Sequence, residues 1–408
     1  MERLTRNFAW LAAANIIGSL FTALLFIYLA RTLGAEAFGH FSYATSLVLY
    51  IYNFMDLGLS TYGIREVAKN HEAVSDYVSN IISFKIAVAF VLFIVLGIIN
   101  VFCSHSLLMK LLLAESSLML FVSALATEWA FQGLERMYMV FISFSFTPLI
   151  QLLASLVLVR GPQDLMRAPL IIFFGTLPVI SIFLKILKFR LRFGIIHMKT
   201  LKGYMASSLV IWAISMFTQV YNGLDIVIMG FFRKAEEVGC FTVARRIVGG
   251  FSLLLVFLAN ALLPRLSATF SSDPVEFRRA TTRFLRFAVL VVTFVFVPVI
   301  IFGREIITLT VGSQYLAAGT SLKLMVMALT LVVFNIPYST ALIASSFERE
   351  VLKQAFASAC LNIILNFLIV PKYGMIGASI SFCAAEGLAL IWVLWAYNNK
   401  IGFYQKGC

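Results

Sequence analysis

Eight ionisable residues of this chain lie inside or at the edge of long apolar stretches, where a charge is costly and therefore informative. Four are basic and four are acidic: Arg31, Lys85, Arg245 and Lys323; Asp56, Glu128, Asp225 and Glu386. A charge at the centre of a membrane-spanning helix costs about 2.5–3.5 kcal/mol on insertion scales, so such residues usually face a cavity or a partner. Each is therefore a candidate site residue, and structural pairing is the alternative.

Two of these alternatives can be stated residue by residue. Lys85 could pair with Asp56 or Glu128, or extend its stem to the inner surface, and Lys323 is close enough to a helix end to do the same. Glu128 also shares a helical stripe with Gln132 and Glu135. One interpretation of this stripe is a polar cavity wall at the inner end of the helix that contains it. The other interpretation is a helix end exposed to solvent.

Other chemistry is not indicated by the spacing of reactive residues. The five cysteines include no CxxC pair, and no two of the four histidines stand at i, i+4. Neither a zinc site nor a disulfide framework is therefore expected. No phosphate-binding loop, nucleophile elbow or HExxH motif occurs. We expect no cofactor, no metal and no enzymatic activity, and an ATP-driven pump is disfavoured.

The elements that must position these charges are membrane-spanning helices. The chain has 408 residues, of which 61% are apolar and 12% charged, about half the charge of a soluble protein. Hydrocarbon cores of about 30 Å need helical runs of about 20 residues. Twelve such spans are predicted: 7–30, 40–62, 80–102, 114–133, 138–159, 168–189, 204–231, 240–263, 284–303, 320–345, 353–370 and 376–398. The fold class is thus an all-α polytopic membrane protein.

The net charge of +13 is better explained by topology than by a nucleic-acid partner. Cytoplasmic loops of membrane proteins collect Lys and Arg. With the N-terminus inside, the inner segments carry 20 of these residues and the outer segments 8. Both termini are therefore predicted to be cytoplasmic. The longest inner loops, 190–203 and 264–283, are too short to hold a folded catalytic domain.

A short internal repeat divides the helices into two sets. The segment Ala35-Glu36-Ala37-Phe38-Gly39-His40-Phe41 recurs 200 residues later as Ala235-Glu236-Glu237-Val238-Gly239-Cys240-Phe241. Both copies follow the first helix of a six-helix set, so the two sets have the same orientation in the membrane. Parallel repeats of this kind are typical of two-lobed transporters with a site between the lobes. We predict an N-terminal lobe at 1–190, a cytoplasmic loop at 191–203 and a C-terminal lobe at 204–408, around a central cavity.

Four stretches of the sequence carry a resemblance to a known family. They are Arg31-Thr32-Leu33-Gly34 through Asp56-Leu57-Gly58-Leu59 to Arg65-Glu66; Glu128-Trp129-Ala130-Phe131-Gln132-Gly133 with Arg136-Met137; Leu224-Asp225 with Glu237-Val238-Gly239 and Ala244-Arg245; and Leu361-Asn362 through Pro371-Lys372-Tyr373-Gly374 to Glu386. In these stretches the chain resembles the O-antigen (Wzx-type) flippases of the multidrug/oligosaccharidyl-lipid/polysaccharide exporter superfamily.

The resemblance implies a substrate, a location and partners. The substrate would be undecaprenyl diphosphate carrying an oligosaccharide unit, translocated by alternating access in the bacterial inner membrane. Arg31, Lys85, Arg245 and Lys323 would then be candidates for neutralising the diphosphate. Asp56, Glu128, Asp225 and Glu386 would be coupling or structural charges. Membrane lipid, a polysaccharide polymerase and a chain-length regulator are the implied partners of a monomer.

Two other functions stay open on the sequence alone. A cation-coupled exporter of the same superfamily would favour acidic cavity residues, whereas basic ones are at least as common here. A membrane polysaccharide polymerase would carry a large outer catalytic loop, and no loop of that size is expected in this chain.

Overall fold

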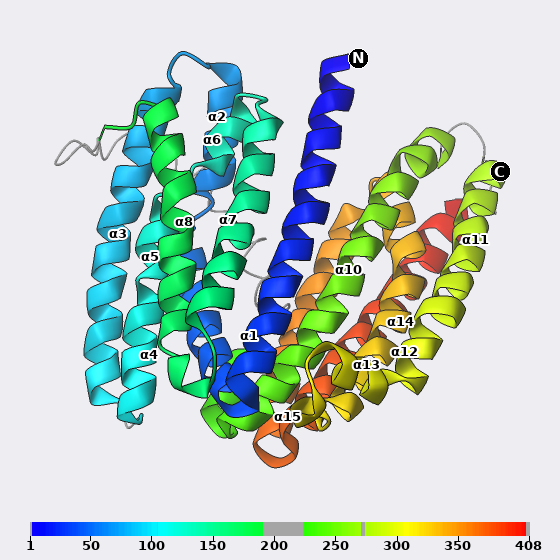
Figure 1. Ribbon diagram of the computed structural model, residues 1–408. Coiled ribbons are helices and arrows are strands. Elements are labelled where there is room, and N and C mark those ends of the chain that lie inside the picture. Colours follow the sequence, from blue (N-terminus) through cyan, green and yellow to red (C-terminus); the bar gives the residue numbers. More distant parts are fainter. Residues whose placement is uncertain (1, 104, 191–222, 271–273, 405–408) are drawn as a thin grey trace. The chain divides into compact units, whose positions relative to one another are not determined.

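The computed structural model describes residues 2–103, 105–190, 223–270 and 274–404. Within these ranges the chain forms helices and turns, with no strand (Figure 1). The chain divides into two compact units, Met1–Val220 and Tyr221–Cys408, which are described separately below. Eight helices of the described part are long and apolar enough to cross a membrane, as an all-helical multi-span protein requires.

Unit 1 begins with a helix far longer than one membrane crossing. Its helices are α1 (Glu2–Asp56), α2 (Leu59–Lys69), α3 (Val74–Phe102), α4 (Leu107–Ser117), α5 (Met119–Ala124), α6 (Glu128–Gly133), α7 (Met137–Leu158) and α8 (Arg167–Ile186). The 55 residues of α1 would extend about 80 Å if straight, but Gly34 has a φ of 80° and breaks the helix. The break falls where the sequence predicts the loop between spans 7–30 and 40–62.

Unit 2 repeats this pattern at its C-terminal end. Its helices are Gly223–Phe232, α10 (Ala235–Phe270), α11 (Pro274–Val291), α12 (Val297–Ile301), α13 (Gly303–Thr310), α14 (Ala318–Ala344) and α15 (Glu348–Tyr404). Gly374 kinks α15 with a φ of 55°, between the predicted spans 353–370 and 376–398. Span 204–231 lies mostly outside the described residues, so the predicted count of twelve spans stays a prediction.

Two predicted spans are less regular than the sequence suggested. Span 114–133 is divided among α4, α5 and α6, with a turn at Leu118 and a short connection at 125–127. Span 284–303 contains a π-helical turn over Val292–Phe296, directly before Pro298. Proline has no N–H to donate and its ring displaces the carbonyl four residues earlier, so the wider turn accommodates it. The helix therefore changes type just before Pro298.

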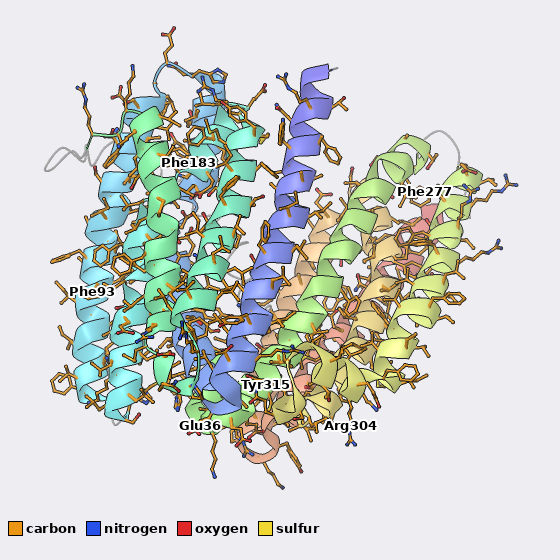
Figure 2. The ribbon with its side chains drawn as sticks, in the orientation of Figure 1. Glu36, Phe93, Phe183, Phe277, Arg304 and Tyr315 are labelled. Atoms are coloured by element: carbon orange, nitrogen blue, oxygen red, sulfur yellow. The ribbon has the colours of Figure 1, made fainter. Side chains whose placement is uncertain are left out.

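The cores of the units are aromatic, while much of the outer surface is apolar. In unit 1 the rings of Phe131 and Phe183 pack edge to face, with centres 4.6 Å apart (Figure 2). In unit 2 Phe277 is fully buried in a cluster with residues of α14 and α15. Large apolar side chains of α3, such as Phe90 and Phe102, are exposed. Exposure on this scale is what a surface in contact with lipid requires.

The two copies of the internal repeat occupy equivalent places. The first copy resumes α1 after the break at Gly34, and the second begins α10. In both, the glutamate at the second position is exposed, while the fourth residue, Phe38 or Val238, is buried. Each copy therefore starts a helix in the same way, which gives the repeat a common structural role.

A backbone hydrogen bond joins the second copy to the kink of α15, and a local salt bridge holds the same glutamate. Arg233 Nε donates to Glu237 Oε2 at 2.7 Å, and Met375 N donates to Glu237 Oε1 at 2.7 Å. Glu237 thus accepts from an amide at the start of the second arm of α15, where helical N–H groups lack partners. The close approach of Glu237 leaves no room for a Cβ at Gly374.

Candidate functional site

In unit 1 the structure joins two of the candidate charges in a buried ion pair. Lys85 Nζ on α3 lies 2.5 Å from Asp56 Oδ1, and the lysine side chain is 1% exposed. Ser60 completes the group, because Lys85 Nζ donates to Ser60 Oγ at 2.9 Å and Ser60 Oγ donates to Asp56 Oδ1 at 2.6 Å. Of the two partners that the sequence left open for Lys85, the structure places Asp56 beside it.

This ion pair stands at a break between two helices. Asp56 is the last residue of α1, and Ser60 lies in the first turn of α2. Between them, Leu57 and Gly58 have φ values of 46° and 75°. Gly58 tolerates this backbone, whereas Leu57 adopts it at a cost of about 1–3 kcal/mol. Interrupted helices with charges at the break are a common construction of transporter binding and coupling sites.

Glu128 has a different partner on a neighbouring helix. It is the first residue of α6, and Ser143 Oγ of α7 donates to Glu128 Oε1 at 2.6 Å. Glu128 thus has a hydroxyl partner of its own, and the Asp56–Lys85–Ser60 group forms a separate set of contacts.

Unit 2 contains a second pair of opposite charges. Arg245 Nε of α10 lies 3.3 Å from Asp225 Oδ2, on the helix Gly223–Phe232, and the side chains are 11% and 4% exposed. The guanidinium carbon of Arg245 also lies 4.5 Å from the centre of the Phe382 ring on α15. Glu386 is buried one turn further along α15, on the same face as Phe382. An arginine held by a carboxylate and an aromatic face is well oriented for a second anion.

The other two basic candidates lie apart from these pairs. Arg31 is exposed near the end of the first arm of α1. Lys323 of α14 is partly buried and packs its stem near Gly303. The structure thus brings together Asp56 with Lys85 and Asp225 with Arg245, and leaves Arg31 and Lys323 outside both pairs. Lys85 and Arg245 each have a neighbouring carboxylate, which a diphosphate would have to replace.

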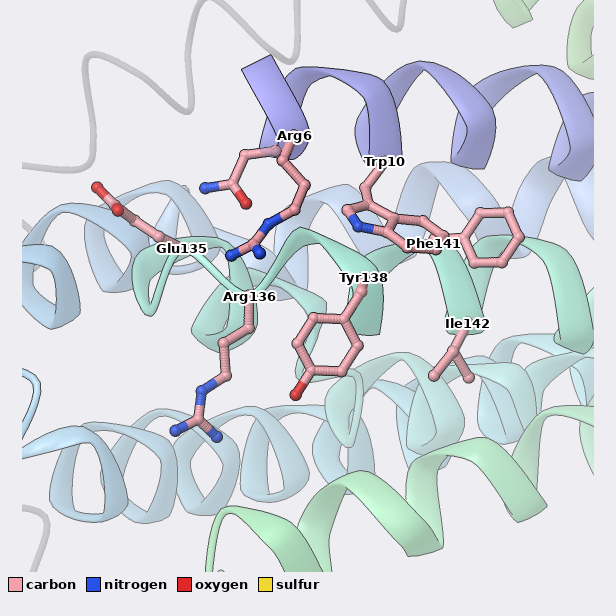
Figure 3. A pocket seen from close by; sticks show the side chains of 8 residues that line it. Arg6, Trp10, Glu135, Arg136, Tyr138, Phe141 and Ile142 are labelled. Carbon is pink, nitrogen blue, oxygen red and sulfur yellow. The ribbon is translucent and has the colours of Figure 1, made fainter. Parts of the chain in front are cut away.

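A pocket lies at the N-terminal end of α1, and of its lining only Glu135 belonged to the polar cavity wall that the sequence predicted. The predicted stripe is wrong, because α6 ends at Gly133 and Glu135 reaches the pocket from the turn after the helix. We call it the α1–α7 pocket; it has a volume of about 560 Å³, and its lining includes Arg6, Trp10, Arg136, Tyr138 and Phe141 (Figure 3). In the sequence, Arg6 and Arg136 contribute only to the positive charge of the inner segments. The sequence feature that could have indicated a pocket is the presence of Trp and Tyr close to these arginines near helix starts, but that pattern is also typical of an ordinary membrane interface.

No group of three or more metal-ligating side chains occurs among the residues that the structure describes. The candidate residues form two buried ion pairs, one of them at the α1–α2 break, and Arg245 also lies over an aromatic ring.

Comparison with known proteins shows the family to which this sequence belongs. A family model described as "Polysaccharide biosynthesis protein" matches residues 4–270. A protein named as an O-antigen transporter in Escherichia coli strain K12 is 24% identical over 98% of both chains. A protein named as the flippase AglR in Haloferax volcanii is 25% identical over 93% of this chain and 80% of its own length.

Solved structures agree on the fold. The lipid II flippase MurJ, in an inward closed conformation, matches with a TM-score of 0.72 at 16% identity, over 95% of this chain and 87% of its own. An inward-facing multidrug transporter of the MATE family matches with a TM-score of 0.69 at 12% identity, over 95% of this chain and 98% of its own. At these identities the likeness concerns the fold alone, which is that of MurJ and MATE transporters.

Proposed function

This chain belongs to the polysaccharide biosynthesis protein family, and we propose that it is a flippase for a lipid-linked oligosaccharide. The observation that carries the proposal is the full-length similarity to proteins named as an O-antigen transporter and a flippase. Its substrate would be undecaprenyl diphosphate bearing a repeat unit of O-antigen or a similar surface polysaccharide. Its location would be the bacterial inner membrane, with both termini in the cytoplasm and a polymerase and a chain-length regulator acting downstream.

The proposed mechanism is alternating access by two six-helix lobes, residues 1–190 and 204–408, in a monomer. A polyprenyl tail can stay in the bilayer while the sugar and the diphosphate cross, so only the polar head needs a protein path. The diphosphate carries negative charge that must be compensated during the crossing. Arg31, Lys85, Arg245 and Lys323 are the proposed cations for this purpose.

The two buried ion pairs suggest how Lys85 and Arg245 stay charged inside the protein before a diphosphate binds. In the empty protein Asp56 and Asp225 neutralise Lys85 and Arg245, which avoids an uncompensated buried charge. An arriving diphosphate would compete with the carboxylate for the guanidinium of Arg245, whose planar fork suits phosphate oxygens. The released Asp225, with Glu386 nearby, could then take up a cation or a proton and couple transport to an ion gradient.

The proposal is tested by the lipid-linked intermediates of a deletion strain. We expect units attached to undecaprenyl diphosphate to accumulate on the inner face, and surface polymer to decrease, because no other route moves the polar head. The measurement is extraction of lipid-linked saccharides with and without an enzyme that cleaves them only at the outer face. Normal surface polymer in the deletion strain would contradict the flippase function.

A cation-coupled exporter is the second candidate, and the structural likeness to a MATE transporter supports it. The two functions differ in their deletion phenotype. Deletion of an exporter would sensitise cells to a cationic compound and leave lipid-linked saccharides unchanged. Deletion of a flippase would make lipid-linked saccharides accumulate and leave the sensitivity to the cationic compound unchanged.

A further inference from the structure

The α1–α7 pocket combines features that suit one kind of ligand. It lies wholly within unit 1, between the first turns of α1 and the start of α7, and Figure 3 shows Arg6 extending from α1 towards Arg136 and Tyr138. Its volume of about 560 Å³ is in the range of about 300–1,000 Å³ typical of small-ligand sites. A ligand of a few linked polar groups would therefore fill it.

Positive charge is the first feature of the pocket. Arg6 and Arg136 both line it, and neither forms an ion pair with any residue that the structure describes. The N-terminal end of α7 adds partial positive charge, because its first amide groups have no partner within the helix. Two arginines and a helix N-terminus border this cavity, and guanidinium groups are suited to binding a phosphate or a diphosphate.

Aromatic rings form the second feature. The Trp10 and Phe141 rings lie 5.2 Å apart across the two helices, and Trp10 and Tyr138 remain 39% and 42% exposed. The C–H face of a sugar ring packs on such exposed rings, and the Tyr138 hydroxyl can bond a sugar hydroxyl. The nearby Glu135 carboxylate supplies acceptors for further sugar hydroxyls and would disfavour a ligand that is only anionic.

The backbone turn between α6 and α7 holds Glu135 and Arg136 beside the pocket. Glu135 has a φ of 57°, in the left-handed region that usually holds glycine. Its N–H donates to Gln132 O at 3.0 Å, and Arg136 N–H donates to Phe131 O at 2.9 Å. These two bonds are the Schellman pattern that ends a helix, so the left-handed residue closes α6 and leaves the Glu135 side chain at the pocket.

We propose that the α1–α7 pocket is a docking site for the diphosphate and first sugar of a lipid-linked saccharide. This inference rests on the proposed flippase function for the identity of the lipid. Arg6 and Arg136 hold the phosphates, Trp10 and Tyr138 hold the sugar, and the tail leaves along the apolar side near Ile142. With the N-terminus in the cytoplasm, the pocket receives the substrate on the side where it is made.

The test is binding of defined lipids to the purified full-length protein, measured by native mass spectrometry. The probe is undecaprenyl diphosphate bearing one N-acetylglucosamine, compared with undecaprenyl diphosphate alone, inorganic diphosphate and phosphatidylglycerol. For Arg6→Gln/Arg136→Gln we expect at least a tenfold loss of probe binding. Trp10→Leu should lower binding of the sugar-bearing probe towards that of undecaprenyl diphosphate alone.

The matched control is Arg65→Gln/Lys69→Gln, which removes two exposed positive charges from α2, outside the pocket lining. It should bind the probe like the wild type. An equal loss in the control, or an equal loss of phosphatidylglycerol binding in the pocket variant, would overturn the proposal in favour of a general attraction to anionic lipid. Unchanged probe binding in the pocket variant would overturn it as well.

Failure of this inference is distinguishable from failure of the flippase function. If the deletion strain accumulates lipid-linked units while the pocket variant binds the probe normally, the pocket proposal is wrong and the function stands. If the deletion strain accumulates none, the flippase function is wrong, and probe binding then tests only the chemistry of the pocket.

Discussion

At the scale of single residues, four of the scarce charges of the apolar interior form two pairs of opposite charge. Asp56 with Lys85, and Asp225 with Arg245, each place opposite charges at ion-pair distance in surroundings nearly closed to water. The net energy of such a pair is small, because the desolvation of two ions offsets their attraction. Loss of one partner is a different matter, since it leaves the other charge buried and uncompensated.

The pair in unit 1 makes this asymmetry measurable. Lys85→Met should lower the stability of the detergent-purified protein by about 3–5 kcal/mol, because Asp56 is left buried without its cationic partner. The double variant Asp56→Asn/Lys85→Met should recover most of that loss. Lys69→Met, at a surface lysine whose side chain is 61% exposed, is the control and should change little. Unfolding midpoints in denaturant decide the matter; equal losses in the single and double variants would show that the two residues act independently.

Arg245 can be tested for a role beyond pairing. Arg245→Ala should abolish most polymer export, but part of that loss could come from the uncompensated Asp225. In Asp225→Asn/Arg245→Ala the buried charge is gone, so the membrane level should return to normal while export stays at least tenfold reduced. Arg246→Ala removes the same charge about 100° further around α10 and serves as the control. Restored export in the double variant would reduce Arg245 to a structural partner.

At the scale of helices, hydropathy predicted most spans because lipid imposes a nearly uniform rule on helix length. Breaks inside apolar runs were harder to foresee. Nothing in the composition around Leu118 marks an interruption, whereas the change of helix type before Pro298 has a visible cause, because proline removes a hydrogen bond wherever it stands. The choice of partner was also out of reach: the sequence offered Lys85 either Asp56 or Glu128, and only the packing of α3 against the α1–α2 break could select Asp56.

The kink of α15 depends on a glycine. Gly374 has a φ of 55°, and an added Cβ would collide with the Glu237 carboxylate. Gly374→Ala should therefore lower stability by about 1–3 kcal/mol, from backbone strain and the loss of the contact between Glu237 and Met375. Gly387→Ala on the same helix is the control, since no side chain or backbone atom outside its own turn lies within 4 Å. Comparable melting temperatures for the two variants would show that the kink does not depend on Gly374.

At the scale of the whole chain, the repeat and the charge distribution are two independent arguments for one topology. The repeat copies begin corresponding helix segments in each unit, and Phe38 and Val238 are buried at the same position. The excess of Lys and Arg on alternate loops predicts the direction of the helices in the membrane. What the sequence could not supply is the α1–α7 pocket, because it forms where the start of α1 meets a strained turn more than a hundred residues later.

That topology can be tested in unit 2 with two cysteines at opposite ends of α10. Residue 235 starts the helix and residue 275 follows its far end, so 36 residues of helix separate the two sides. In a background with the five native cysteines replaced by alanine, Ala235→Cys should react with a membrane-impermeant maleimide in intact cells. Val275→Cys, at a side chain that is 58% exposed, should react only after permeabilisation. The cysteine-free parent sets the background. Labelling of residue 275 in intact cells would reverse the topology, placing the α1–α7 pocket on the outer face, where it could serve release of the substrate but not its capture.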